Sequence, residues 1–264
     1  MEHVKEIGQD AIAITDHGVM YGVIDFYRAA KAAGVKPIIG CEVYVARRTR
    51  HDKVHGVDGN PYHLVLLCKN EEGYRNLIHM VSVAYSEGFY NKPRVDLDLL
   101  RAHAGGLIAL SACLAGAVPS LILQQNYEGA KQMALEYRDI FGADNFYLEL
   151  QDHGLPEQRD VSRGVLKIAE ETGIPLVVTN DAHYTRREDA KIQDVLMCIQ
   201  MGKTVDDIDR MRFETEEFYL KSEEEMAALF PEHPEAVTNT AEIAARCNLE
   251  FTFGEYHLPS FDVP

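Results

Sequence analysis

The chain has 264 residues, a formal net charge of −16 and a hydrophobic content of 46%. That length accommodates one large domain or two small ones, and the composition supports a substantial core. No apolar run approaches the roughly 20 residues of a membrane span, and the polar N-terminus does not resemble a signal peptide, so we expect a cytoplasmic protein without a membrane partner. Proteins that bind duplex DNA over a broad surface are usually basic, so we expect any nucleic-acid contact to be local or to come from other parts of a larger protein.

The five cysteines are scattered along the chain, and no two of them form a CxxC pair. A zinc ribbon and a thioredoxin-like redox motif are therefore not expected. Disulfides are uncommon in the cytosol, so we expect most of these cysteines to be small buried residues.

A helix that ends near a glycine and leads into a short apolar strand recurs along the chain. A glycine at this place closes the last helical turn in the left-handed conformation. The predicted strands are residues 11–15, 37–45, 62–68, 107–111, 145–150 and 175–179. Alternating apolar strands and helices indicate an α/β fold with a parallel sheet. Six such units favour a closed barrel over an open doubly wound sheet, for which no GxGxxG or Walker motif is present.

Potential metal ligands lie at or near most of these strand ends. In α/β barrels the chemistry lies at the carboxyl ends of the strands. In an extended chain, side chains two positions apart point to the same side. Asp181 and His183, which follow their strand, therefore form a plausible metal-binding pair. His, Asp and Glu side chains suit zinc, manganese or iron, and carboxylates can bridge two metals. The candidates in chain order are Asp16, His17, Glu42, His63, Cys113, Glu149, His153, Asp181 and His183.

Several of these residues have a structural alternative that the sequence leaves open. Asp16 is either a ligand or the acceptor that fixes an imidazole tautomer. His63 and Cys113 are either ligands or buried residues without a site role. His153 is a site residue or an exposed loop histidine, and Glu149 is a site residue or the partner of a loop cation.

The basic run that contains Arg47, Arg48 and Arg50 has two interpretations as well. It is a solvated loop or a phosphate contact at the mouth of the site. Farther along, the apolar stripe of helix 190–201 (Ile192, Val195, Leu196, Ile199) indicates core packing. Ser222–Glu225 is a capping box that opens a helix, and Pro234 is the first residue of another that runs to about Cys247.

Six motifs follow one another along the chain: Ala13–Gly22, Ile39–Tyr44, Tyr62–Leu67, Ser111–Gly116, Phe146–Gly154 and Thr179–Tyr184. Together they resemble the polymerase and histidinol phosphatase (PHP) domain. More closely, they resemble the version that begins the alpha subunit of bacterial DNA polymerase III, a C-family replicative polymerase. The match covers essentially the whole chain, and the ordered set is more specific than any single motif.

The resemblance implies a distorted (β/α)7 barrel with two or three divalent metals, zinc, manganese or iron. The residues that match the ligand positions are His17, Glu42, His63, Cys113, Asp181 and His183, with Asp16, Glu149 and His153 as further metal or supporting residues. In some members the resemblance implies 3′–5′ exonuclease activity, in which a metal-bound hydroxide attacks the phosphodiester.

The same resemblance implies a larger protein and a set of partners. Residues 1–247 correspond to the PHP domain, and 248–264 to a linker and the start of the polymerase palm. The implied partners are the remainder of the alpha subunit, a DNA primer end, a proofreading subunit and the sliding clamp, and the parent polymerase would use magnesium. The polymerase aspartates would lie beyond Pro264, so we do not expect this chain to copy DNA by itself.

The chain departs from the family pattern at its start. The family begins with a strand that carries a His-x-His motif, whereas Met1–His3 opens what we expect to be a helix. His3 has no partner two residues away and does not replace the motif. We therefore expect an N-terminally truncated fragment whose barrel lacks its first strand and whose site lacks two ligands.

Three functions compete at this point. The first is a metal-dependent phosphoesterase domain of the replicative polymerase, and the second is an inactive domain that braces the polymerase and docks a proofreading subunit. The third is a free-standing phosphatase of the histidinol phosphatase type. The palm-like segment Leu258–Pro264 argues against the third, because a free-standing enzyme needs no such extension.

Overall fold

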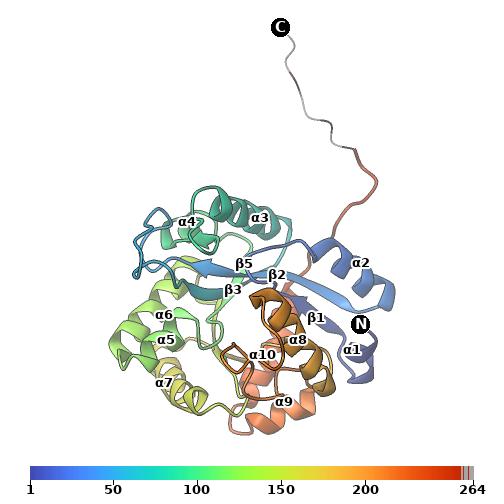
Figure 1. The fold of residues 1–264 in the computed structure, drawn as a ribbon. Helices are drawn as coiled ribbons and strands as arrows, with labels where there is room; N and C mark the ends of the chain where they lie inside the picture. The colour runs from blue at the N-terminus through green and yellow to red at the C-terminus, as the bar shows by residue number, and fades with distance from the viewer. Residues whose placement is uncertain (257, 259–260, 262–264) are drawn as a thin grey trace.

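A computed structural model describes residues 1–256, 258 and 261. Figure 1 shows a curled sheet with most helices packed around it. The strands are β1 (Ala11–Ile14), β2 (Lys36–Val45), β3 (Tyr62–Cys68), β4 (Arg94–Val95), β5 (Leu107–Leu110), β6 (Phe146–Leu150) and β7 (Leu176–Val178). The helices are α1 (Glu2–Glu6), α2 (Val23–Ala33), α3 (Glu71–Ser86), α4 (Leu97–Ala102), α5 (Ala117–Leu123), α6 (Tyr127–Phe141), α7 (Pro156–Thr172), the 3₁₀ turn η1 (Arg187–Asp189), α8 (Ala190–Met201), α9 (Glu223–Leu229) and α10 (Pro234–Arg246).

Local sequence explains where several of these helices begin and end. Gly34 and Gly173 close α2 and α7 in the left-handed conformation, with φ of 73° and 69°. The predicted capping box opens α9 through Ser222 and Glu225, and Pro234 is the first residue of α10. The predicted glycines at helix ends, the capping box and the proline at the start of α10 are thus confirmed.

The sheet has the strand order β1-β2-β3-β5-β6-β7, and β4 pairs with β2. All six predicted strands are present. The prediction of a parallel sheet is wrong at β3, which is antiparallel to both β2 and β5. The connection from β2 to β3, residues 46–61, contains no helix that could return the chain across the sheet, so the two strands pair antiparallel. The start of β3 therefore lies at the same edge as the carboxyl ends of β1 and β2.

The sheet curls but does not close. Within residues 1–256, no strand pair joins β1 to β7. The side of β1 away from β2 is covered by α1 and by the segment before α9. His3 Nε2 lies 3.3 Å from the main-chain oxygen of Leu220, and Gln9 Nε2 donates to the main-chain oxygen of Lys221 at 3.1 Å. The distorted barrel is thus confirmed as a curled α/β sheet, whereas the expected closure is not observed.

The core lies on both sides of the central strands. Every residue of β5 and β6 is buried. On one side, Leu77 and Met80 of α3 and Val165 of α7 join the largest cluster of buried apolar residues. On the other side, Ile243 of α10 packs in a second cluster with residues of β2, β3, β5, β6 and β7. This double coverage holds the strand ends in fixed positions.

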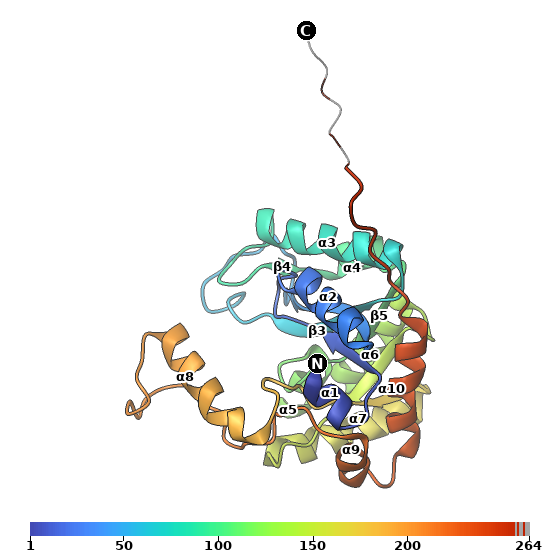
Figure 2. The ribbon, with the colours of Figure 1, turned by 90° about the vertical axis from the view of Figure 1, so that its right-hand side faces the viewer.

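Helix α8 contradicts the prediction made from its apolar stripe. Its bounds agree with the prediction, but the four stripe residues are between 45% and 71% exposed: Ile192, Val195, Leu196 and Ile199. Figure 2 shows α8 standing away from the body of the domain. Core packing is therefore wrong here, because an amphipathic pattern defines an apolar face but not what covers it. No described helix is long and apolar enough to span a membrane.

The first residues of the predicted linker 248–264 pack against the domain. Glu250 accepts hydrogen bonds from Tyr27 Oη at 2.5 Å and from Lys31 Nζ at 2.6 Å on α2. The Phe251 ring meets those of Tyr27 and Tyr74 edge to face, with centroids 4.8 and 4.9 Å away. The predicted palm segment 258–264 lies outside the described residues except for positions 258 and 261.

Candidate metal centre

Three of the predicted ligands meet at one edge of the sheet. His17 follows β1 and forms an isolated bridge with Glu42 of β2, and His63 is paired with Tyr44 in the β2–β3 register. The antiparallel direction of β3 brings His63, at its start, to the carboxyl end of β1. Ligand atoms of His17, Glu42 and His63 all lie within 4.8 Å of one another, a geometry that can hold a metal ion. We call these three residues the cluster.

The Glu42 carboxylate lies at the centre of the cluster. It is 4% exposed, and Oε2 is 3.5 Å from His17 Nδ1. Oε1 forms an ion pair with His63 Nδ1, yet this buried oxygen receives no hydrogen bond. Burying a carboxylate is unfavourable unless charge partners and hydrogen bonds compensate. A divalent cation between the carboxylate and the two imidazoles would supply the missing interaction, so these residues fit a metal.

Asp181 and His183 approach the cluster from the end of β7. His183 Nδ1 donates to the main-chain oxygen of Asp181 at 2.6 Å, which leaves Nε2 as the nitrogen with a free lone pair. The His17 and His183 ring centroids are 6.0 Å apart. Burial raises the pKa of Asp181; the neighbouring imidazoles, His183 first, oppose this, and the Glu42 carboxylate adds to it. Asp181 adopts φ of 44°, so the loop conformation is set by more than local preference.

Cys113 lies beside the cluster after β5. Its Sγ is 3.9 Å from His63 Nδ1. Burial raises the pKa of this thiol well above its usual range, with further increases from the Asp181 and Glu42 carboxylates. In this environment the side chain is a neutral thiol, and a cation placed at the cluster would favour the thiolate.

Glu149 connects two strand ends and does not join the cluster. Its carboxylate accepts hydrogen bonds from the main-chain nitrogen of Ala112 and from Thr179 Oγ1, the latter at 2.7 Å. Burial raises the pKa of Glu149 to about 7. The predicted alternative, pairing with a loop cation, is not what the structure shows, because a backbone amide and a hydroxyl take that place.

His153 supports the Asp181 loop. It is 1% exposed, and it stacks on Phe218 with ring centroids 3.9 Å apart. Nδ1 accepts from Gln158 Nε2 at 2.6 Å, and Nε2 donates to the main-chain oxygen of Asn180 at 2.8 Å. Both ring nitrogens are therefore occupied by protein groups, and the alternative of an exposed loop histidine is wrong.

Asp16 contributes its backbone to the site. Its main-chain oxygen accepts hydrogen bonds from the main-chain nitrogen of Glu42 at 3.1 Å and from Cys41 Sγ at 3.2 Å. The Asp16 carboxylate lies beside Gly22 at the start of α2. Asp16 thus fixes the junction of β1 and β2 rather than joining the three clustered side chains.

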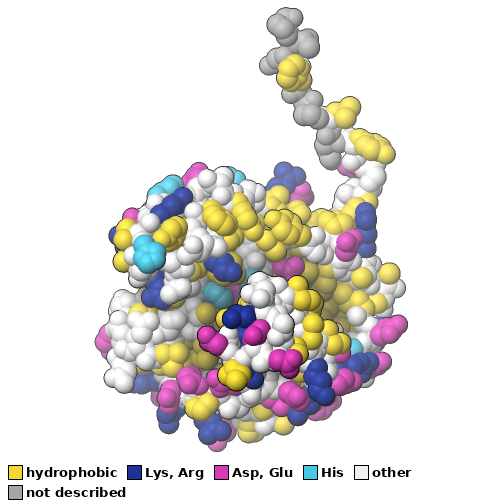
Figure 3. All heavy atoms as spheres, viewed as in Figure 1, with side chains coloured by type: hydrophobic (Ala, Val, Ile, Leu, Met, Phe, Trp, Pro, Cys, Tyr) yellow, Lys and Arg dark blue, Asp and Glu magenta, His cyan; other side chains and the backbone are white. Residues whose placement is uncertain are grey.

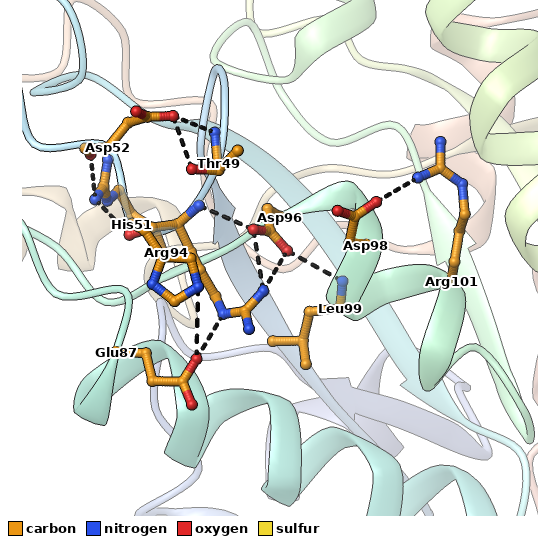
Figure 4. A network of polar contacts seen from close by, with 10 residues as sticks. Thr49, His51, Asp52, Glu87, Arg94, Asp96, Asp98, Leu99 and Arg101 are labelled. Carbon is orange, nitrogen blue, oxygen red and sulfur yellow. Dashed lines mark hydrogen bonds and ion pairs between the residues drawn. The ribbon is translucent and has the colours of Figure 1, made fainter.

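Most arginines of the basic run form ion pairs with carboxylates of the domain. Arg48 forms two hydrogen bonds with buried Asp58, and Arg50 pairs with Asp96 and Glu87. Figure 4 shows part of this network, including Asp96, Glu87 and the buried Arg94. Arg47 donates to Tyr62 Oη at 3.2 Å and lies over that ring, 4.4 Å from its centroid. Because neighbouring residues on a strand face opposite sides, Tyr62 and its Arg47 partner lie on the other face from His63.

Two important residues have no role in the sequence prediction. Tyr44 lies on the same face of β2 as Glu42, two residues away, and its ring centroid is 5.2 Å from that of His63. The strand periodicity could have identified it. Arg94 is fully buried and donates hydrogen bonds to the main-chain oxygens of Gly88, Asp58, Arg50 and Asp52. Its partners are distant in sequence, so no local pattern indicates it.

Comparison with known proteins is consistent with this architecture. A family model described as the PHP domain matches residues 1–153. The chain is 50% identical over 261 residues to the DNA polymerase III subunit alpha of Treponema pallidum and 47% identical over 274 residues to that of Thermus aquaticus. These alignments cover 98% and 100% of this chain but only 22% of each relative.

A crystal structure of a proposed metal-dependent phosphoesterase from Bifidobacterium adolescentis aligns with a TM-score of 0.41 and 13% identity, covering 68% of this chain and 79% of that one. This likeness is too weak to support a conclusion. The family-model match extends over more than half of the sequence, from the first residue through β6. The chain therefore belongs to the PHP domain family.

Proposed function

We propose that the cluster binds a divalent metal ion and that the domain hydrolyses phosphodiesters at the 3′ end of DNA. The observation that carries this proposal is the buried Glu42 carboxylate, which faces two imidazoles and has one oxygen without a hydrogen bond. Asp181, His183 and Cys113 are further ligands in this proposal. Zinc, manganese or iron suits this donor set of imidazole, carboxylate and thiol.

A bound divalent metal supplies a polarised phosphoryl oxygen and an activated water, so no side-chain nucleophile is required. The protein holds the donor atoms in place. Glu149 ties the end of β5 to the end of β7, and His153 holds the main-chain oxygen of Asn180, next to Asp181. His183 donates through Nδ1 and therefore presents Nε2. These contacts orient the ligands before a metal binds, which is the function of supporting residues in metal sites.

The relatives favour a larger protein around this domain. Both relatives described above are alpha subunits of DNA polymerase III, and this chain spans about a fifth of each. We propose that residues 1–247 form the PHP domain of such a subunit and that 248–264 lead toward its polymerase part. The partners in this proposal are the remainder of the subunit, a DNA primer end, a proofreading subunit and the sliding clamp, in the cytoplasm. The polymerase reaction itself would use magnesium. These relatives weigh against a free-standing histidinol-phosphatase-like enzyme.

The exposed apolar face of α8 favours a second candidate function. Ile192, Leu196 and Ile199 are 60%, 54% and 71% exposed on a helix that stands away from the body. Exposed apolar surfaces of this kind indicate contact with another protein surface. In this alternative the domain is inactive, braces the polymerase and docks a proofreading subunit.

Metal analysis separates the two candidates. The purified chain, with no metal added, is analysed by elemental mass spectrometry beside the Glu42→Gln variant and the control Glu87→Gln, whose carboxylate pairs with Arg50 on the surface. We expect at least one equivalent of zinc, manganese or iron in the wild type and the control, and its loss in Glu42→Gln. Release of nucleotides from a labelled 3′ end would then be measured. A folded wild type that contains no metal and acquires none on dialysis would favour the bracing function.

A further inference from the structure

Three exposed aromatic side chains lie just before α2, on α3 and just after α3. Tyr21 is 82% exposed, Tyr85 41% and Phe89 49%. The Tyr85 and Phe89 rings are stacked, with centroids 6.1 Å apart and an interplanar angle of 25°, and the Tyr21 side chain is close enough to that of Tyr85 to raise the pKa of Tyr85, after the larger effect of burial. Figure 3 shows a band of hydrophobic side chains over α3 and α2, above a hollow with histidine and basic side chains. We call Tyr21, Tyr85 and Phe89 the aromatic track.

Tyr44 connects the track to the cluster. Its ring centroid lies 5.2 Å from that of His63 and 6.3 Å from that of His17. Lys92, which lies on the same segment as Phe89, is within 5.4 Å of the Tyr44 ring centroid. The segment that carries Phe89 therefore reaches the residue that borders the metal ligands.

Lys92 lies next to Tyr44, close to the cluster. Lys92 Nζ is 5.4 Å from the centroid of the Tyr44 ring. Among the described residues, no carboxylate lies within ion-pair distance of Lys92 Nζ, whereas the nearby acidic residue in sequence, Glu87, pairs with Arg50 at 2.8 Å. In a chain with a net charge of −16, this leaves a positive charge available on the side of the sheet that holds the cluster.

The buried Arg94 holds the segment that carries Phe89 and Lys92 in place. Arg94 Nε donates to the main-chain oxygen of Gly88 at 2.9 Å, and its guanidinium lies 5.5 Å from the Tyr90 ring centroid. A Cβ at Gly88 would lie 1.9 Å from the main-chain oxygen of Arg94, so only glycine allows this approach. Phe89 therefore lies on a fixed turn, which lowers the entropy cost of binding at this ring.

We propose that the aromatic track binds the unpaired bases of single-stranded nucleic acid, with Lys92 on a backbone phosphate, and directs the strand to the cluster. Exposed aromatic rings beside a cation form the usual platform for unpaired bases, because every base has a face that stacks. The exposed face of α8 is aliphatic instead, which suits a protein surface. The direction of the strand rests on the function proposed for the cluster, whereas binding to the track does not require a metal.

Fluorescence anisotropy of a labelled oligothymidylate, measured in EDTA, tests the track by itself. We expect Tyr21→Ala and Phe89→Ala each to weaken binding by about fivefold or more, the range of base–aromatic stacking. Tyr21→Phe keeps the ring and should bind like wild type, as should Tyr256→Ala, which removes a 94% exposed tyrosine from the C-terminal segment. Lys92→Gln should reduce the slope of log affinity against log salt by about one unit.

Each outcome has a definite meaning. Binding that is absent in the wild type, or equal in wild type, Tyr21→Ala and Phe89→Ala, overturns the proposal. Alanine variants that alter self-association in sedimentation but not oligonucleotide affinity identify a protein contact and overturn it as well. Oligonucleotide binding by a protein that never holds metal leaves the track intact and rejects only the function proposed for the cluster. Metal in the cluster without oligonucleotide binding rejects only the track.

Discussion

Arg94 and Glu42 are both buried, at 0% and 4% exposed, but they differ in how their charges are satisfied. Arg94 donates to four main-chain oxygens, and buried Asp58 accepts two hydrogen bonds from Arg48 and one from the main-chain nitrogen of Val54. Glu42 has imidazole neighbours and an oxygen without a hydrogen bond. Charges satisfied within the protein stabilise a loop, whereas an unsatisfied buried charge needs a further explanation, which in our proposal is a metal ion.

Among the replacements that test this comparison, that of Arg94 should have the largest effect on the free energy of unfolding. Arg94→Met leaves four main-chain oxygens without their donor in a buried place. We expect a loss of about 3 kcal/mol or more in the free energy of unfolding, measured by urea denaturation. Arg101→Met is the control, since Arg101 is half exposed and, among the described residues, its ion-pair partners are Asp98 and Glu136. That variant should lose about 1 kcal/mol or less. Equal losses would mean that the Arg94 network is not structural.

Glu42→Gln, unlike Arg94→Met, should not lower the stability of the metal-free protein. In EDTA the variant should unfold at the same temperature as wild type or higher, because it removes a buried charge that lacks full compensation. With zinc at about 100 times its dissociation constant, wild type should gain about 2.7 kcal/mol and the variant none. Differential scanning calorimetry with and without zinc measures both. A variant that is strongly destabilised in EDTA would show that Glu42 is satisfied by protein groups alone.

Replacing Asp58 should have the smallest effect on stability, present at neutral pH and lost in acid. The hydrogen bonds from Arg48, against the opposing effect of burial, lower the pKa of Asp58 to about 2. A carboxylate whose folded pKa is lowered stabilises the protein above its unfolded pKa near 4, and this contribution is lost as the pH falls toward 2. Wild type should therefore be more stable than Asp58→Asn at pH 7, and the difference should shrink between about pH 4 and pH 2. A constant difference in acid-unfolding curves would assign the effect to packing.

The sequence prediction was most successful where local rules apply. Residues 11–15 and 175–179 form strands within one residue of the predicted bounds, Ser222 caps the start of α9 and Pro234 is the first residue of α10, as predicted. Strand ends also indicated the cluster, since His17, Glu42 and His63 are brought together. The metal roles of these residues stay predictions.

The prediction failed where a partner lies far along the chain. The direction of β3 depends on strands from both sides of it in sequence. His153 was expected to be a site residue or an exposed loop histidine, and the structure excludes only the exposed loop, because its two nitrogens bond to Gln158 and to the main chain of Asn180. The stripe of α8 has the period of a core helix and yet is exposed.

The sequence by itself determined six of the strands, the caps of several helices and the kinds of ligand that the strand ends carry, because backbone conformation and side-chain chemistry are local properties. Only the tertiary structure decided that β3 runs antiparallel, which brings His63 to Glu42, and that Glu149 and His153 are satisfied by protein groups. Hydrogen-bond satisfaction depends on which groups share the same buried volume, and that volume is formed only when distant segments pack.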